Sequence, residues 1–259
     1  MRIITLRRFL VGLTALFLFP LAAHAVIHSA REQPPNWREA RWESVGMLPQ
    51  AGADREARLL VFTGRTGRWK GIFSVHSWVV FKPAGTATWS RYDVVGWGNP
   101  VRQNGWAPDG RWYGDVPRVL LDVKGQAAET FIPKVRAAIA DYNYRNAGDY
   151  RMWPGPNSNT FIAAVLRAVP ELGMTLPPNA VGKDFRDGIY AGLTDSRTGV
   201  ELSLYGVVGI KAGWVEGLEL NMLGLVAGLD IRHPAVKLPG LGRLGIDDGT
   251  AVAAPMTAK

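Results

Sequence analysis

The 259-residue sequence contains no cysteine, which excludes disulfide bonds, thiolate metal sites and a cysteine nucleophile. Histidine is scarce too, and the four in the chain are His24, His28, His76 and His233. Metal centres usually draw on several histidine or cysteine ligands, so we expect neither a metal nor another cofactor. Within the expected folded core, His76 is the obvious candidate for imidazole chemistry.

A strong excess of charge is missing as well. The formal net charge is +8, and three of the positive charges come from Arg2, Arg7 and Arg8 at the start of the chain. Such a modest surplus does not indicate a nucleic-acid partner. This net charge is consistent with a surface that is charged only for solubility. It is also consistent with attraction to an anionic lipid or polymer of a cell envelope.

The first 25 residues have the order of a secretion signal. Basic residues come first, an apolar run covers residues 9–22, and Ala23-His24-Ala25 places small residues where a signal peptidase reads them. The apolar run is shorter than the roughly 20 residues that a membrane-spanning helix needs. We therefore predict an exported, periplasmic protein cleaved after Ala25, with an uncleaved anchor to the inner membrane as the alternative.

Alternation and helical spacing predict an α+β fold, in which an antiparallel sheet packs against a few helices. The predicted strands cover residues 58–62, 71–83, 88–96 and 116–123. Gly, Pro and Asn predict a loop over residues 98–114. One helix is expected after Gly125, and another begins near Asn157 and ends before Pro170.

The last third of the chain contains an internal repeat. Residues 199–206 and 217–224 both begin Gly-x-Glu-Leu and alternate in the same way, at an offset of 18 residues. This pattern predicts strands of one Gly-rich β appendage.

Five segments follow from these patterns. Their predicted bounds are 1–25 for the signal or anchor, 26–57 for a linker or surface arm, 58–190 for the α+β domain, 191–245 for the β-hairpin appendage and 246–259 for a disordered tail.

One group of residues in the α+β domain could form a catalytic site. A turn centred on Ala84-Gly85 would place His76 opposite Asp93 on the next strand, with Cβ atoms roughly 4.5–5.5 Å apart. The same register pairs Trp78 with Arg91, in a cation–π contact. A slip of one residue would move Asp93 to the opposite face of the sheet.

Ser158 admits two interpretations at the start of the second helix. As an N-cap, its hydroxyl would accept a hydrogen bond from a backbone N–H of the following turn. As a nucleophile, it would attack a carbonyl, and the free N–H groups of the helix N-terminus would hold the developing oxyanion.

These motifs resemble those of the circularly permuted papain-like proteins, which include NlpC-type amidases and lecithin retinol acyltransferase-like proteins. Val-His-Ser-Trp at 75–78 is followed by Asn-Ser-Asn-Thr-Phe at 157–161. In that group, a strand His and a polar orienting residue on the next strand precede an Asn-Cys-x-x-Phe motif at a helix start. Ser158 stands at the cysteine position, so the resemblance implies a triad of Ser158, His76 and Asp93.

A longer span, from about Glu56 to Phe185, resembles an uncharacterised family of bacterial envelope proteins, a domain of unknown function. The matching strings are Gly-Arg-Trp-Lys-Gly-Ile-Phe-Ser-Val-His-Ser-Trp at 67–78, Tyr-Asp-Val-Val-Gly-Trp-Gly at 92–98 and Trp-Pro-Gly-Pro-Asn-Ser-Asn-Thr-Phe at 153–161. This resemblance implies an envelope location and no particular activity.

Tryptophan is concentrated in the α+β domain and is interleaved with Arg and Lys. The six residues are Trp69, Trp78, Trp89, Trp97, Trp106 and Trp112. Such rings stack on sugars, bind cations or lie at membrane interfaces, but large aromatics also fill the cores of small domains. We expect at least half of the six to belong to the core.

Two function classes result. The first is a serine-type amide or ester hydrolase or acyltransferase, in which Ser158 attacks, His76 is the base and Asp93 orients His76. The second is a non-catalytic envelope protein that binds a peptide, glycan or lipid in a cleft lined by Trp and Arg. Membrane association through the first segment and the β appendage is a third, purely structural role.

Overall fold

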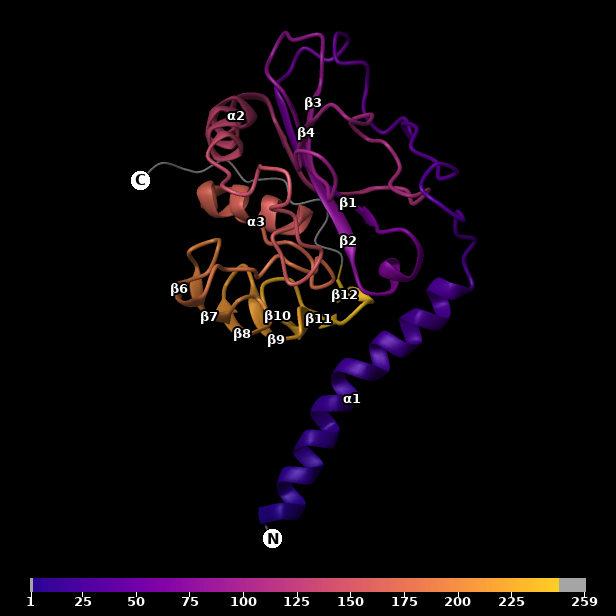
Figure 1. The fold of residues 1–259 in the computed structure, drawn as a ribbon. Coiled ribbons are helices and arrows are strands. Elements are labelled where there is room, and N and C mark those ends of the chain that lie inside the picture. Colours follow the sequence, from indigo (N-terminus) through magenta and orange to yellow (C-terminus); the bar gives the residue numbers. More distant parts are fainter. Residues whose placement is uncertain (1, 247–259) are drawn as a thin grey trace.

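The computed structural model describes residues 2–246, which form three α-helices and two antiparallel sheets (Figure 1). This confirms the predicted α+β class with a strand-rich C-terminal region. The N-terminal helix α1 (Arg2–Ser29) extends from one side of the molecule, as Figure 1 shows. The tail predicted for residues 246–259 lies outside the described residues except for Ile246.

The first sheet has five strands in the order β4-β3-β2-β1-β5. Their bounds are β1 (Arg58–Arg65), β2 (Val75–Lys82), β3 (Ser90–Val94), β4 (Val101–Gln103) and β5 (Arg118–Lys124). The interior of β1 reads Leu-Leu-Val-Phe-Thr-Gly because both faces of this central strand are buried. A short 3-10 helix η1 (Arg68–Ile72) precedes β2, and for this reason β2 begins later than the predicted residue 71.

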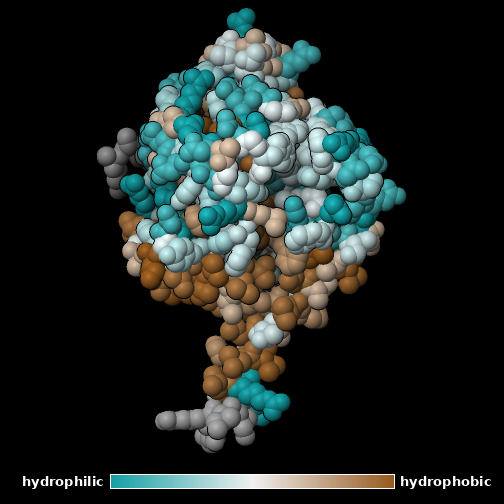
Figure 2. Space-filling model, in the orientation of Figure 1, coloured by the Kyte–Doolittle hydropathy of each residue, from teal (hydrophilic) through white to brown (hydrophobic). Residues whose placement is uncertain are grey.

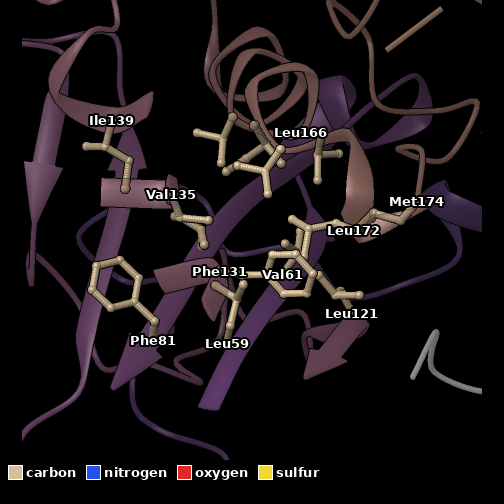
Figure 3. Packing of buried hydrophobic residues seen from close by; sticks show 14 of the residues in the cluster. Leu59, Val61, Phe81, Leu121, Phe131, Val135, Ile139, Leu166, Leu172 and Met174 are labelled. Atoms are coloured by element: carbon tan, nitrogen blue, oxygen red, sulfur yellow. The ribbon is translucent and has the colours of Figure 1, made fainter. Parts of the chain in front are cut away.

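Helices α2 (Gly125–Ala140) and α3 (Ser158–Ala168) cover one face of this sheet, and a 3-10 turn η2 (Pro170–Leu172) follows α3. Phe131, Val135 and Ile139 recur every four residues, so they share one buried face of α2. They meet Val61 and Phe81 of the sheet in the main core (Figure 3). The predicted helices are thus confirmed.

Aromatic loops cover the opposite face of the sheet. Trp78 and Trp112 are buried there with Phe62, and Trp89 and Trp106 pack against them. The expectation that at least half of the six Trp residues belong to the core is confirmed. The remaining two, Trp69 and Trp97, are exposed.

The second sheet is a seven-stranded meander in the order β12-β11-β10-β9-β8-β7-β6. Its strands are β6 (Ile189–Leu193), β7 (Gly199–Leu204), β8 (Val208–Gly213), β9 (Gly217–Met222), β10 (Leu225–Asp230), β11 (Ala235–Leu238) and β12 (Gly242–Gly245). The two repeat copies form β7 and β9 of this one sheet, which confirms the prediction. Gly206 and Gly224 have positive φ values of 68° and 79° in equivalent turns after the repeats, where glycine fits without strain.

Two details differ from the sequence predictions. The loop expected over residues 98–114 contains β4, which pairs with β3 at the sheet edge. The register of β2 and β3 pairs Val80 with Arg91, two residues away from the register expected from a turn at Ala84-Gly85. Because a shift of two residues preserves the face of each side chain, His76 and Asp93 still lie on the same side of the sheet.

Candidate functional site

His76, Asp93 and Arg91 form a buried hydrogen-bonded group on the aromatic face of the first sheet. The Nε2 of His76 donates to Oδ1 of Asp93 at 2.8 Å. Arg91 donates to both carboxylate oxygens of Asp93, from Nε at 2.7 Å and from Nη2 at 2.9 Å. The structure therefore brings together two of the three predicted site residues and adds Arg91, which we had assigned only to Trp78.

The charges of this group follow from burial and from the arginine. Burial lowers the pKa of His76, although Asp93 acts in the opposite direction, so the neutral imidazole is favoured. Burial would raise the pKa of Asp93, but the adjacent Arg91 and the hydrogen bonds from Arg91 and His76 lower it overall. The group is thus an ion pair of Asp93 and Arg91 with a neutral His76 attached.

Aromatic rings enclose the group on the remaining sides. The imidazole of His76 stacks on Trp112 with ring centroids 3.6 Å apart and planes inclined by 5°. The guanidinium of Arg91 lies 4.2 Å from the ring centroid of Trp78, which confirms the predicted cation–π contact. His76 is only 4% exposed, so these Trp and Arg residues form a packed cluster around it.

Ser158 lies at the start of α3, but it is not the N-cap. Asn157 occupies that position, and its Oδ1 accepts hydrogen bonds from the backbone N–H groups of Asn159 at 2.9 Å and Thr160 at 3.1 Å. Thr160 completes a capping box by accepting from the N–H of Asn157 at 3.1 Å. The interpretation of Ser158 as the cap is therefore wrong by one residue.

Strand alternation turns the His76 side chain away from the start of α3. Ser77 donates to Oδ1 of Asn159 at 2.9 Å, so the Ser77 side of β2 faces the start of α3. Adjacent residues of a strand point to opposite faces, and His76 accordingly points to the Trp112 side. Among the described residues, no hydrogen bond joins Ser158 to His76.

The second sheet contains a feature that the sequence analysis did not identify: its charged side chains point inward. Register places Glu201 beside Lys211, and Lys211 beside Glu219. All three are buried, at 3%, 6% and 5% exposure. The sequence pattern that could have indicated this feature is the alternation of the repeat. In each copy, Glu and either Ser or Asn lie on one face of the strand, and the apolar residues lie on the other.

Ion pairs neutralise these inward charges. Glu219 contacts Lys183 at 2.5 Å and Lys237 at 2.6 Å, and Lys211 contacts Asp184 at 2.7 Å. Burial would lower the pKa of Lys183, but Asp184 and Glu219 raise it overall, so this lysine stays charged. The charged face thus has partners on the loop before β6 as well as within the sheet.

The other face of the second sheet is apolar and exposed. Ile189, Val200 and Ile210 are 77%, 62% and 55% exposed, respectively. Figure 2 shows this region as a continuous hydrophobic surface that leads into α1. The further exposed members of this face are Leu193, Leu202, Leu204, Val208, Leu218, Leu229, Val236 and Leu244.

Helix α1 is long and apolar enough between Thr5 and Ser29 to cross a membrane, with a mean hydropathy of 2.2. Of the segment predicted as a signal or anchor, residues 1–25, only the first part of α1 is separate from the folded domain. Phe17, His24 and His28 are buried against the domain. His24 Nδ1 donates to the carbonyl of Ile72, and His28 Nε2 donates to the carbonyl of Arg68, each at 2.8 Å.

Metal ligands are not clustered in the part of the chain that the structure describes. Residues 2–246 contain no group of three or more His, Cys, Asp or Glu side chains that could hold a metal ion.

Comparison with known proteins matches residues 56–185, half of the chain, to the family described as "Protein of unknown function (DUF3750)". These residues run from just before β1 to the loop before β6. No curated protein and no solved structure matches the chain.

Proposed function

The chain belongs to the DUF3750 family, whose description names no function, and from its geometry we propose a non-catalytic membrane protein of the cell envelope. In this proposal α1 is retained as an anchor and is not removed as a signal peptide. The observation that carries it is the docking of α1 on the domain. Cleavage after Ala25 would remove Phe17 and His24 from the surface that they fill.

The orientation follows from the charges at the start of α1. Arg2, Arg7 and Arg8 precede the apolar run, and basic residues beside a membrane span stay on the cytoplasmic side. The α+β domain then lies on the outer side of the inner membrane. This arrangement agrees with the secretion-like order of the first segment.

Among the partners considered, a lipid fits the exposed chemistry better than a peptide or a glycan. Of the Trp and Arg residues expected to line a cleft, Trp78, Trp112 and Arg91 are packed around His76 and Asp93. The apolar face of the second sheet is instead open to a partner. We therefore place the binding function on that face.

The N-terminus of the native protein tests the anchor. We expect mass spectrometry of the membrane fraction to find α1 intact, and alkaline carbonate washing to leave the protein in the membrane. A protein that begins at Val26 and is released by the wash would show that α1 is a cleaved signal.

A serine-type hydrolase or acyltransferase is the second candidate function. The 2.8 Å bond between His76 and Asp93 favours it, because a base oriented by a carboxylate is what a serine nucleophile requires. Attack by Ser158 would need the start of α3 and the strand β2 to rearrange, since β2 directs Ser77 toward the start of α3 and His76 toward Trp112.

An active-site fluorophosphonate probe distinguishes the two candidates. Labelling of the wild type that is lost in both Ser158→Ala and His76→Ala would support the hydrolase and overturn the non-catalytic proposal. We expect the same background labelling in all three proteins.

A further inference from the structure

In the second sheet, the polar and apolar faces are reversed relative to the usual arrangement. A sheet with one face on the protein and the other in water has apolar residues inside and polar residues outside. Here cross-strand register pairs Leu202 with Ile210 and Ile210 with Leu220 on the outer face, while Glu201, Lys211 and Glu219 line the inner face. An outer face of this composition indicates that its normal surroundings are apolar.

The length of α1 identifies these surroundings. Residues 5–12 are exposed, but from Leu13 onward one side of the helix is covered by the domain. The free part is therefore about 12 Å long at 1.5 Å per residue. A bilayer has a hydrocarbon layer about 30 Å thick. If α1 crosses it, the docked part of the helix must lie in hydrocarbon too, together with the adjacent surface of the domain.

The outer face of the sheet is that adjacent surface. Leu16 of α1 lines a shallow apolar hollow of about 850 Å³ together with side chains of β6 to β10, among them Ile210 and Leu229. Helix α1 also contacts β10 and β11. The lipid-facing side of the anchor and the outer face of the sheet are thus one continuous surface (Figure 2).

The rim of the sheet carries residues that are typical of the membrane interface. Three exposed residues lie in turns at one end of the strands. They are Arg197 in the β6–β7 turn, Trp214 in the β8–β9 turn and Arg232 in the β10–β11 turn. Tyr205 lies in the β7–β8 turn, at the opposite end of the strands, and is 49% exposed. Trp and Tyr favour the level of the headgroups, and Arg attracts anionic lipids.

We propose that the outer face of β6 to β12 is immersed in the outer leaflet of the bilayer that α1 crosses, with lipid acyl chains against Leu202, Ile210 and Leu229. The protein is then held by two elements, a spanning helix and a sheet that dips into one leaflet. This inference rests on the proposed function, because it requires α1 to be retained.

The absence of cysteine allows a direct test by single-site labelling. Full-length variants Ile210→Cys, Leu10→Cys and Thr88→Cys each provide one thiol on an exposed residue for a fluorescent label. Position 210 probes the sheet, position 10 probes the anchor, and position 88 is the control in the β2–β3 loop, at the opposite end of the molecule (Figure 1). The labelled proteins are reconstituted in vesicles of phosphatidylethanolamine and phosphatidylglycerol.

Two quenchers then report the surroundings of each label. We expect lipids with a nitroxide on the acyl chain to reduce fluorescence at positions 210 and 10, and iodide in the water to reduce it only at position 88. Circular dichroism of the three proteins checks that the labelled chains are folded.

The outcomes separate this inference from the proposed function. Quenching by lipid at position 10 and by iodide at position 210 would overturn the inference and leave the anchor in place. Protection of position 210 from both quenchers would overturn it in favour of a second copy or another protein on the sheet. Loss of lipid quenching at position 10 would overturn the anchor, and the inference with it.

Discussion

In the five-stranded sheet, apolar side chains point inward on both faces, whereas in the seven-stranded sheet the inward side chains are charged and the outward ones are apolar. Leu59 and Val61 of β1 are covered by α2 and α3, and Phe62 is covered by tryptophans. Glu201, Lys211 and Glu219 are covered by the loop before β6 and by each other. The difference shows that the same strand alternation can turn either the apolar or the charged side chains inward, depending on what lies against the sheet.

Loss of an inward charge should have the largest effect. Glu219→Ala leaves Lys183 and Lys237 without their shared partner in a buried site, so we expect the free energy of unfolding to fall by about 3–5 kcal/mol. Chemical denaturation in detergent micelles measures it. Ile210→Ala, on the outer face of the neighbouring strand, is the matched control and should cost less than about 0.5 kcal/mol. Equal losses would contradict the inverted sidedness of the sheet.

A matched pair of leucines compares the two sheets directly. Leu59 is fully buried and Leu202 is 49% exposed. We expect Leu59→Ala to lower the free energy of unfolding by about 2–5 kcal/mol, because it leaves a cavity in the main core. Leu202→Ala in the same micelles should change it by less than about 0.5 kcal/mol. A large loss at Leu202 would mean that a protein surface covers the outer face.

The start of α3 tests how this helix is held on the first sheet. Asn157→Ala removes the cap and should destabilise the protein by about 0.5–2 kcal/mol. Ser158→Ala is the neighbouring control and should change stability by less than about 0.5 kcal/mol. Thermal unfolding of the two variants beside the wild type measures the difference, and the reverse order of effects would restore Ser158 as the cap.

The smallest expected effect is a pH dependence that arises from His76. Burial lowers its pKa in the folded state, so below its ordinary pKa of about 6.5 the unfolded chain takes up the proton first. Stability from the neutral imidazole is complete above that pH and decreases as the pH falls below it. His76→Gln should flatten the decrease of the melting temperature between about pH 7 and pH 5. An unchanged slope would assign the decrease to other groups.

Much of the α+β domain was predictable because its signals are local. A short apolar run located β1, alternation located β2, four-residue spacing located α2, and Pro170 ended α3. Contact between His76 and Asp93 was also predictable, although the register was off by two residues. The loop of residues 83–89 is longer than the tight turn assumed, and no local signal sets that length.

The position of Ser158 relative to His76 was not predictable in the same way. The motif order placed both in one site, but their distance depends on the face of β2 against which α3 packs. That choice is made by Ser77 and Asn159, which bond across the interface, and by the apolar side chains beside them.

By itself, the sequence determined an apolar N-terminal helix, alternating strands and a repeat whose two faces differ in polarity. A period of two residues separates the faces of a strand but does not say which one is inside. Only the tertiary structure decided that the charged face of the repeat points inward, where Lys183 and Lys237 meet the carboxylate of Glu219. The physical reason is that a buried charge is tolerated only beside an opposite charge, and these partners come from outside the repeat.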